Sequence, residues 1–514
     1  MKTVSASREK KARTGSTYVQ KRNNKEQDTQ QRKHLLYGVV GGVLAVLVAA
    51  LLIWDSGFFQ KNTTAVTIDG EAFTPAVVQY YYNSAMQTEL SMVQYGMSSF
   101  DYTQSPKKQI KDEETGQTYH DYFIDEAIEA LTQTTMLNHT AQEESYVLSE
   151  EGQEYLQTQL SQLDVAWRVS GTYSNLTGYL RANYGKYMTE DIFKDIVNRE
   201  ITASYFQQDH QDSLTYTASD LDTYYQEHKN ELDTFTYSVF TVQATVPTQT
   251  DEEGNTVELS EEEQTAALET AKTEAKALAE EIQTKLLSGT DAQTLATEYE
   301  EQLYSSNVNV TNVGSSVSSS YSEWLYDENR TPGEVSIQEY DNTSSYLYYV
   351  VQFENRYLDE SPTADVRHIL IGAGSDPTEE EFAAAEEKAQ GILDQFLADG
   401  GTEEDFATLA EENSEDSGSA SNGGLYTGVS TSTGFIEAFT QWCLDPARQP
   451  GDTGLVKNED SSTKGWHIMY FVGWNEPVWK QTATSALQSS DMTVWLENLT
   501  TDVQVERGSG LDTI

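Results

Sequence analysis

The stretch Gln441-Trp-Cys-Leu-Asp-Pro-Ala-Arg-Gln-Pro-Gly-Asp452 occurs twice in this chain, the second time in altered form as Glu323-Trp-Leu-Tyr-Asp-Glu-Asn-Arg-Thr-Pro-Gly-Glu334. The Trp, Asp, Arg, Pro and Gly residues match without a gap at an offset of 118 residues. Farther upstream, Leu295-Ala296 resembles Leu409-Ala410. Repetition at a long, nearly constant offset indicates that one folding unit is present in two copies.

Each copy begins with an apolar, strand-like run and continues into an amphipathic helix. In the first copy we expect the helix to start at the capping box Ser260-Glu-Glu-Glu263. In the second copy we expect Asp376 as the N-cap, with Pro377 in the first turn. A strand, helices and a closing strand in each copy predict two α+β domains, over residues 231–357 and 363–475. The apolar stripe of the second helix is Phe382, Ala385, Ala389, Ile392, Leu393 and Phe396.

Four stretches of the second copy are Val366-Arg-His-Ile-Leu-Ile371, Asp405-Phe-Ala-Thr-Leu-Ala410 leading into Asn413-Ser-Glu-Asp-Ser-Gly-Ser419, Asn422-Gly-Gly424 and Gly465-Trp-His-Ile468. In this order and spacing they resemble the parvulin family of peptidyl-prolyl cis/trans isomerases. Any one of these motifs alone would be a weak signal, but the four together cover the whole length expected of that domain.

The resemblance implies a site in the second copy. His368, Asp416 and His467 fall at the positions of the polar network that parvulins place around the prolyl bond, and are the expected catalytic residues. Phe439 matches the Phe of the proline pocket. The interval from Gly434 to Phe439 is one residue shorter than usual, so the pocket Met of the family falls on Ile436 or on Phe435. Lys464 stands where the family often has a hydroxyl residue, and no role is assigned to it.

Isomerisation of an X-Pro bond suits such residues, because the reaction needs no nucleophile. Rotation about the peptide bond costs about 18–20 kcal/mol since amide resonance is broken. A site therefore needs an apolar slot for the proline ring and a polar network that favours the twisted amide. No cofactor or metal is expected, because no Cys/His cluster has the spacing of a zinc site. The single cysteine, Cys443, is expected to be a buried small hydrophobe.

The first copy lacks these polar residues. In the alignment of the two copies His368 corresponds to Val239, His467 to Leu347, and Asp416 falls near Gln302. The Asn-Gly-Gly motif is missing as well. We therefore expect the first copy to be a degenerate parvulin-like domain without catalytic activity.

The N-terminal part predicts a membrane anchor. Residues 35–54 are uncharged and long enough to span a bilayer. They follow a tail, residues 1–34, with ten Lys or Arg and only three Asp or Glu, in a chain of net charge −51. By the positive-inside rule the tail is cytoplasmic and the acidic remainder lies outside. A cleaved signal peptide is the alternative, but no small-x-small cleavage site follows the apolar run.

Residues 55–230 are expected to form a mainly helical module, since apolar positions recur at helical spacing. Its layout is loosely similar to the chaperone module of PrsA/SurA-like exported foldases. The clusters Tyr80-Tyr-Tyr82 and Tyr224-Tyr225 are either packing residues or a sticky surface for unfolded chains. By analogy with these foldases, the C-terminal segment 476–514 is expected to pack as a helix on the chaperone module.

The sequence thus predicts a single-pass, extracytoplasmic isomerase and chaperone that acts on unfolded or nascent secreted polypeptides with X-Pro bonds. One membrane and an outward-facing foldase suggest a Gram-positive type of cell. The alternatives are a holdase chaperone whose parvulin folds are inert, and a structural envelope protein. The acidic composition argues against nucleic acid as a partner. Clients, preferred proline contexts and oligomeric state are not predicted.

Overall fold

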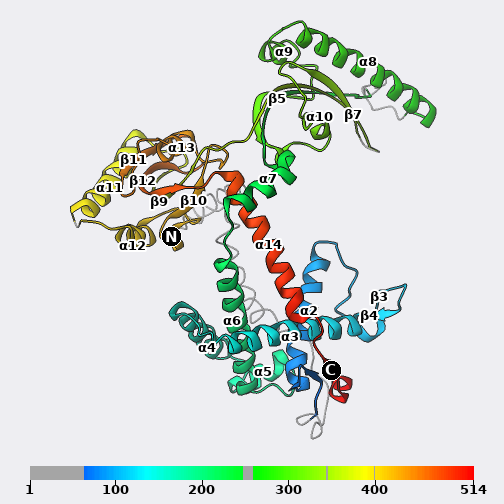
Figure 1. Cartoon of the computed structure of the whole chain (residues 1–514), viewed down its shortest axis with the longest axis vertical. Helices are drawn as coiled ribbons and strands as arrows, with labels where there is room; N and C mark the ends of the chain where they lie inside the picture. Colours follow the sequence, from blue (N-terminus) through cyan, green and yellow to red (C-terminus); the bar gives the residue numbers. More distant parts are fainter. Residues whose placement is uncertain (1–62, 247–258, 343–344, 399) are drawn as a thin grey trace, which may run out of the picture. The chain divides into compact units, whose positions relative to one another are not determined.

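The computed structural model describes residues 63–246, 259–342, 345–398 and 400–514 (Figure 1). The predicted basic tail, residues 1–34, and the predicted membrane helix, residues 35–54, lie outside the described residues. Among the helices of the described part, none combines the length and apolar character needed to cross a bilayer. The chain divides into two compact units, which we call unit 1 (described residues 63–215 and 486–514) and unit 2 (residues 216–485).

Unit 1 is mainly helical. Its small sheet has the order β13-β1-β2, so strands from both ends of the described chain pair with each other. The turn between β1 and β2 is Asp69-Gly70, with positive φ at both residues, as two-residue hairpin turns require. The elements of unit 1 are β1 Val66–Ile68, β2 Glu71–Phe73, α2 Pro75–Gln94, η1 Pro106–Lys108, β3 Ile110–Asp112, β4 Gln117–Thr118, α3 Tyr119–Glu143, α4 Glu150–Val169, α5 Leu176–Tyr184, α6 Glu190–Ser213, the end of α14 Val478–Thr500, β13 Val505–Arg507 and η4 Ser509–Thr513.

Aromatic side chains fill the core of unit 1. Tyr80, Tyr81 and Tyr82 of α2 are buried among α3, α5 and α6 residues, so they are packing residues and not a sticky surface. Tyr224 and Tyr225 of the following unit are half-buried. From the C-terminal segment, Trp495, Leu496 and Leu499 of α14 pack against a cluster that includes Phe206 of α6.

Unit 2 contains the two copies of the repeat, and they have the same order of strands and α-helices. The first sheet is β6-β5-β8-β7 and the second is β10-β9-β12-β11, so each strand has a counterpart. After α7 Ala218–Leu232, the first copy consists of β5 Thr234–Gln243, α8 Glu261–Leu287, α9 Ala292–Glu298, β6 Ser305–Val313, η2 Gly314–Ser316, α10 Ser322–Leu325, β7 Val335–Asn342 and β8 Ser345–Tyr357.

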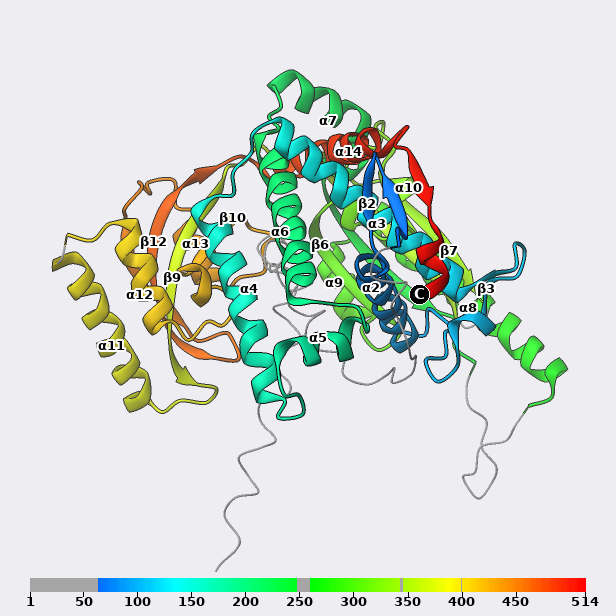
Figure 2. The same cartoon turned by 90° about the horizontal axis from the view of Figure 1, so that it is seen from below.

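The second copy repeats this order before α14 begins. Its elements are β9 Thr363–Gly374, α11 Glu379–Ala398, α12 Glu403–Asn413, η3 Ala420–Asn422, β10 Leu425–Val429, α13 Glu437–Cys443, β11 Thr453–Asn458 and β12 Lys464–Asn475. Helices α11 and α12 cover one face of the sheet, as both views show (Figures 1 and 2). Cys443 is buried, in the cluster between α13 and the other face.

The capping predictions have different outcomes in the two copies. Helix α8 starts at the predicted capping box of Ser260 and Glu263. In the second copy the prediction of Asp376 as the cap is wrong. The Thr378 hydroxyl accepts from Glu381 N, and the Glu381 carboxylate accepts from Thr378 N, so the capping box lies two residues later. Helix α11 therefore begins at a Thr-x-x-Glu capping box and not at the Asp-Pro pair.

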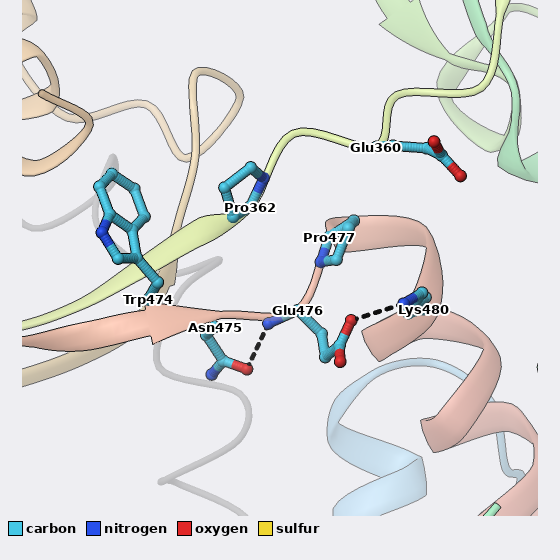
Figure 3. Close-up of a pocket in the computed structure, with 7 residues that line it drawn as sticks. All are labelled: Glu360, Pro362, Trp474, Asn475, Glu476, Pro477 and Lys480. Carbon is cyan, nitrogen blue, oxygen red and sulfur yellow. Dashed lines mark hydrogen bonds and ion pairs between the residues drawn. The ribbon is translucent and has the colours of Figure 1, made fainter. Parts of the chain in front are cut away.

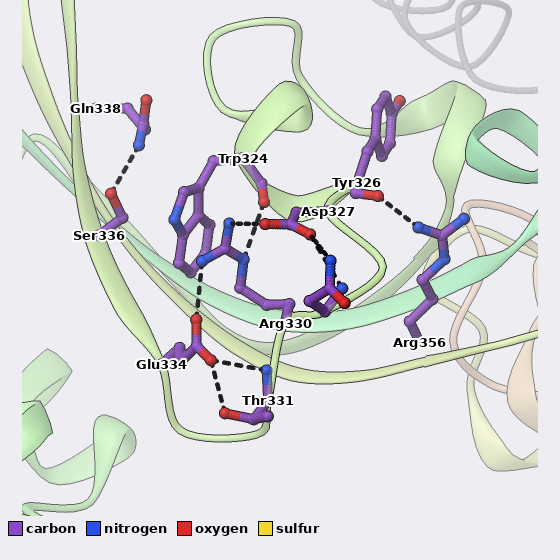
Figure 4. Close-up of polar contacts among 10 residues, drawn as sticks. Trp324, Tyr326, Asp327, Arg330, Thr331, Glu334, Ser336, Gln338 and Arg356 are labelled. Atoms are coloured by element: carbon purple, nitrogen blue, oxygen red, sulfur yellow. Dashed lines mark hydrogen bonds and ion pairs between the residues drawn. The ribbon is translucent and has the colours of Figure 1, made fainter.

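The repeated motif forms one local structure in both copies. In the first copy Arg330 lies over the Trp324 ring, 4.1 Å from its centroid, and donates from Nε to the Trp324 carbonyl at 3.1 Å (Figure 4). In the second copy Arg448 makes the same two contacts with Trp442, at 4.1 and 3.0 Å. The motif thus clamps the turn between a short helix and a sheet strand. We call it the Trp–Arg clamp.

Candidate active site

Strand register places the two predicted histidines beside each other. His368 on β9 lies opposite Met469 of β12, and His467 lies opposite Leu370 of β9. Side chains alternate along a strand, so His368, Leu370 and His467 lie on the same face of the sheet. The two imidazoles meet there, with His368 Nδ1 and His467 Nδ1 3.0 Å apart. Both side chains are buried.

Asp416 is brought to the same place by the loop that follows α12. The backbone N–H of Glu415 donates to the Leu370 carbonyl at 2.9 Å, which ties this loop to β9. One oxygen of Asp416, Oδ2, then lies 2.9 Å from His368 Nε2. The same oxygen accepts from the hydroxyls of Ser419 and Tyr426, at 2.6 and 2.8 Å. The structure therefore brings together all three predicted catalytic residues.

These contacts fix the charge of Asp416. Burial by itself would raise the pKa of its carboxyl group, but the interaction with His368 and the hydrogen bonds from Ser419 and Tyr426 outweigh burial. The pKa of Asp416 is held well below its usual range. At neutral pH the network thus contains one ionised carboxylate, to which the His368 Nε2–H donates.

The remaining protons of the network follow from that assignment. The two Nδ1 atoms lie 3.0 Å apart, so one of them donates and the other accepts. With His368 Nε2–H directed at Asp416, the arrangement in which His467 Nδ1–H donates to His368 Nδ1 satisfies both rings. His467 Nε2 is then an acceptor and lies 3.2 Å from Asn458 Nδ2. Burial, followed by the neighbouring His368, lowers the pKa of His467 to about 3, so this ring is neutral at physiological pH.

The Asn-Gly-Gly loop is shaped by close backbone approach. Arg367 Nη1 donates to the carbonyls of Asn422 and Gly423, at 3.1 and 3.0 Å. The Gly424 carbonyl oxygen accepts a hydrogen bond from the backbone N–H of His368 at 2.9 Å. A Cβ on Gly424, whose φ is +71°, would lie 2.2 Å from the His368 carbonyl oxygen. This position needs glycine both for conformation and for space.

Aromatic residues form the apolar side of the site. Phe439 is buried, and its ring centroid lies 5.5 Å from that of His368 and 5.3 Å from that of His467. Phe435 is half-buried and contacts both Phe439 and Tyr426, with centroids 4.7 and 4.8 Å apart. Ile436 is half-buried on the same cluster. Each of the three predicted pocket residues thus packs beside the polar network.

Three residues of the network were not singled out from the sequence. Ser419 lies in the quoted Ser-Gly-Ser run, and Tyr426 follows the Gly-Gly pair, so both stand close to recognised motifs. Asn458 lies nine residues before His467 and carries no motif of its own. Only the pairing of β11 with β12 could have indicated it, because that hairpin returns Asn458 to the start of β12.

The register of the first copy corrects part of the sequence alignment. Val239 lies opposite Val351, and His368 lies opposite Met469. Val351 and Met469 are related by the repeat offset of 118 residues, so Val239 does occupy the His368 position. The match of His467 with Leu347 is wrong by two residues. His467 pairs with Val456 of β11, and the corresponding pair in the first copy is Tyr349 with Gln338.

The position of Asp416 also shifts. The hydrogen bond from Glu415 N to Leu370 O has its counterpart in the bond from Tyr304 N to Thr241 O. This equivalence places Ser305, and not Gln302, at the Asp416 position. The first copy thus has Val239, Tyr349 and Ser305 where the second has His368, His467 and Asp416.

A separate cavity of about 510 Å³ lies in unit 2, where β12 leads into α14 (Figure 3). Pro362, Trp474, Pro477 and Lys480 are among its lining residues, and Lys480 pairs with Glu476 at 2.8 Å. None of the network residues lines it. Over the described residues, no group of three His, Cys, Asp or Glu side chains is arranged to hold a metal ion.

Comparison with known families identifies the second copy. Residues 368–473 match the family model described as the rotamase, PPIC-type PPIASE domain. This part of the chain is a PPIC-type rotamase domain. The match begins at His368, contains Asp416 and His467, and covers less than half of the 514 residues. A comparison with curated proteins gives no match.

Solved structures similar to the chain include PrsA proteins. The peptidylprolyl isomerase PrsA of Bacillus anthracis is 20% identical over 27% of this chain and 58% of its own, with a TM-score of 0.18. PrsA of Bacillus subtilis is 13% identical over 77% and 91%, with a TM-score of 0.27. A SurA-like chaperone of Campylobacter jejuni is 7% identical over 87% and 99%, with a TM-score of 0.21. The chain spans 58% and 55% of the PrsA structures from Bacillus anthracis and Bacillus cereus.

Proposed function

We propose that this protein is a peptidyl-prolyl cis/trans isomerase whose rotamase domain acts on X-Pro bonds of unfolded polypeptides. The observation that supports this most strongly is the joined network of His368, Asp416 and His467 beside the Phe439 cluster. We assign the catalytic role to these three residues and binding of the proline ring to Phe435, Ile436 and Phe439.

The proposed mechanism follows from the electronic structure of the amide. The planar prolyl bond owes its barrier to resonance, which places negative charge on the carbonyl oxygen and positive charge on the nitrogen. Twisting the bond removes this separation of charge. An ionised Asp416 close to the carbonyl end destabilises the planar form relative to the twisted form, while the aromatic surface holds the ring. No nucleophile, metal or cofactor takes part.

Burial divides the proposed pocket into a floor and a rim. Phe439 is 1% exposed, so it supports the site from below and keeps the two histidines in place. Phe435 and Ile436 retain exposed surface and supply the faces on which the ring would lie. Tyr426 joins the two sides, because its hydroxyl donates to Asp416 while its ring contacts Phe435.

A protease-coupled isomerisation assay on soluble residues 60–514 tests the proposal. We expect acceleration well above background for X-Pro peptides, and a fall in kcat/KM of roughly 10²-fold or more in His467→Ala and Asp416→Ala, because the polar network acts mainly in the transition state. If the isomerisation rate of these variants falls to the uncatalysed rate, the first copy contributes no isomerase activity. A folded wild-type protein without acceleration on several X-Pro peptides would contradict the proposal.

The second candidate is a holdase chaperone with inert parvulin folds. It is favoured by a run of exposed apolar side chains in unit 1: Met92, Tyr95, Met97, Tyr102 and Ile110. Methionine and tyrosine at a surface suit contact with varied apolar segments. Suppression of client aggregation, measured beside the isomerase assay, separates the two activities, and a protein active in both combines them.

The expected setting of this activity is the outer side of a cell membrane. We propose that residues 35–54 anchor the chain there, with the N-terminus in the cytoplasm and secreted polypeptides as clients. We also propose that residues 55–230 form the chaperone module and that residues 476–514 complete it. Fractionation of cells, with protease added from outside, tests the anchor, since an outward-facing chain is degraded in intact cells.

A further inference from the structure

One end of the polar network is formed by an amide whose orientation is fixed by the backbone. Asn458 ends β11 and is 3% exposed. Its Oδ1 accepts the backbone N–H of Ser461 at 3.2 Å. Its Nδ2 lies 2.8 Å from Ser461 Oγ, 3.0 Å from the Thr463 carbonyl and 3.2 Å from His467 Nε2.

The opposite orientation of this amide would be costly. A rotated side chain would direct its NH₂ group at the Ser461 N–H, a second donor, and its oxygen at the Thr463 carbonyl, a second acceptor. Ser461 Oγ donates to the Thr463 carbonyl at 2.6 Å, which leaves its lone pairs to accept from Asn458. The hairpin between β11 and β12 thus holds the Nδ2 group toward His467.

A fixed donor at this point decides where the proton of His467 sits. Asn458 Nδ2 carries two hydrogens and accepts none, and Ser461 Oγ, the Thr463 carbonyl and His467 Nε2 share these hydrogens as acceptors. A proton on His467 Nε2 would face this donor, so the ring proton stays on Nδ1. His467 Nδ1–H then donates to His368 Nδ1, and His368 Nε2–H donates to Asp416. Every donor along this path points toward the carboxylate.

We propose that Asn458 is a positioning residue that selects the Nδ1–H tautomer of His467 and thereby orients the whole network toward Asp416. The proposal rests on the proposed isomerase function for its role in catalysis. Asn458 contacts the network at His467 Nε2, so it acts through that ring. Lys464, which stands where related domains often have a hydroxyl group, provides no such partner in the described contacts.

An aspartate at position 458 favours the opposite tautomer of the His467 ring. In Asn458→Asp the new carboxylate accepts from His467 Nε2–H, so the ring carries its proton on Nε2 or on both nitrogens. The titratable groups that face His467 are then the new carboxylate, Asp416 and His368, of which two are acidic. We expect the ring to titrate at a higher pH than in the wild type, and kcat/KM to fall about tenfold or more, as for other residues that hold a histidine tautomer.

The experiment uses the full chain with ¹⁵N-labelled histidine and detects each ring by its two nitrogen shifts, with His467→Gln assigning the signal. Wild type is expected to show protonated Nδ1 and unprotonated Nε2 for His467 at neutral pH, and Asn458→Asp is expected to show protonated Nε2. Asn458→Ala removes the donor and should give a mixture of tautomers. Asn413→Asp is the matched control, because Asn413 also donates from a half-buried amide, to the Leu409 carbonyl.

An unchanged His467 tautomer in both Asn458→Ala and Asn458→Asp would overturn the proposal, and so would unchanged kcat/KM with a changed tautomer. If Asn458→Asp does not fold, Asn458→Ala alone decides. The nitrogen shifts do not depend on turnover. A wild-type protein without isomerase activity would therefore defeat the proposed function, while the tautomer result would still be read separately.

Discussion

The two copies in unit 2 share a frame and differ at its centre. In both, four antiparallel strands have the same order, and a Trp–Arg clamp holds the same turn. At the position of the polar network, however, the first copy has a tyrosine cluster: Tyr321 lies with its centroid 5.7 Å from that of Tyr237 and 5.5 Å from that of Tyr349. The frame and the network are therefore separate features of this fold.

The difference shows which residues the fold requires. Tyr321 stands at the offset of Phe439, and Tyr349 at that of His467, so a tyrosine ring takes the place of the His467 imidazole in the first copy. Val239 in place of His368 adds to an apolar cluster with Phe235 and Val351. Buried polar networks cost stability unless every member is paired, and replacement by apolar groups removes that demand. The second copy retains the network, which is what a functional role would require.

The largest expected difference between the copies is in their response to acid. The pKa of His467 is about 3 in the fold and about 6.5 in an unfolded chain. Between these values the unfolded chain takes up a proton that the fold excludes, so this stabilisation is complete above pH 6.5 and is lost as the pH falls toward 3. The loss is up to about 5 kcal/mol. The lowered pKa of Asp416 adds a loss of the same sign at still lower pH.

Hydrogen exchange on the full chain at pH 7 and pH 4.5 measures this effect in each copy. We expect protection to fall in β9 and β12, and to change less in β5 and β8, where Val239 and Tyr349 stand in place of the two histidines. The variant His467→Tyr gives the second copy the residue that the first copy has at this position and should flatten the response of β12. Equal losses of protection in the two copies would show that the network is not the cause.

The second prediction concerns the glycine loop that the first copy lacks. In Gly424→Ala the Cβ meets the His368 carbonyl oxygen at 2.2 Å, so the loop must move away from β9. We expect a loss of about 3 kcal/mol or more, together with loss of isomerase activity, because the same movement displaces Ser419 and Asp416. Thermal unfolding and kcat/KM of the full chain measure the two effects.

Gly400→Ala is the matched control for this variant. Gly400 also has a positive φ, of +74°, but a Cβ there meets nothing within 4 Å. Only the backbone cost of about 1 kcal/mol is expected, with activity unchanged. If both variants lose the same stability, close approach to His368 is not what requires Gly424.

Much of this comparison could be predicted from the sequence because the repeat and its motifs are local patterns in the chain. The offset of the Trp–Arg clamp identified two copies, and four motifs located His368, Asp416 and His467. Apolar periodicity identified α8, α11 and α14, whose packing faces are regular.

What the sequence could not provide depends on pairing between distant strands. Strands β6, β7, β10 and β11 were not predicted, and without the register of β7 against β8 the partner of His467 was placed at Leu347 instead of Tyr349. Asn458 was missed for the same reason, since only the β11–β12 hairpin brings it to His467. Tyr80 to Tyr82 left two interpretations open, because burial of an aromatic run is decided by helices from elsewhere in unit 1.

The smallest expected effect separates the two Trp–Arg clamps. Arg330 pairs with Asp327 at 3.4 Å and with Glu334 at 2.8 Å, whereas Arg448, within the described part of the chain, pairs only with Asp445, at 3.8 Å. The residue at the Glu334 position of the second copy is Asp452, whose shorter side chain accepts from Gln449 N. We expect Arg330→Ala to cost about 2 kcal/mol in the first copy and Arg448→Ala about 1 kcal/mol in the second. Hydrogen exchange of β8 and β12 measures each cost, and Glu334→Gln should reduce the difference. Equal costs would mean that the stacked rings, and not the carboxylate, set the strength of the clamp.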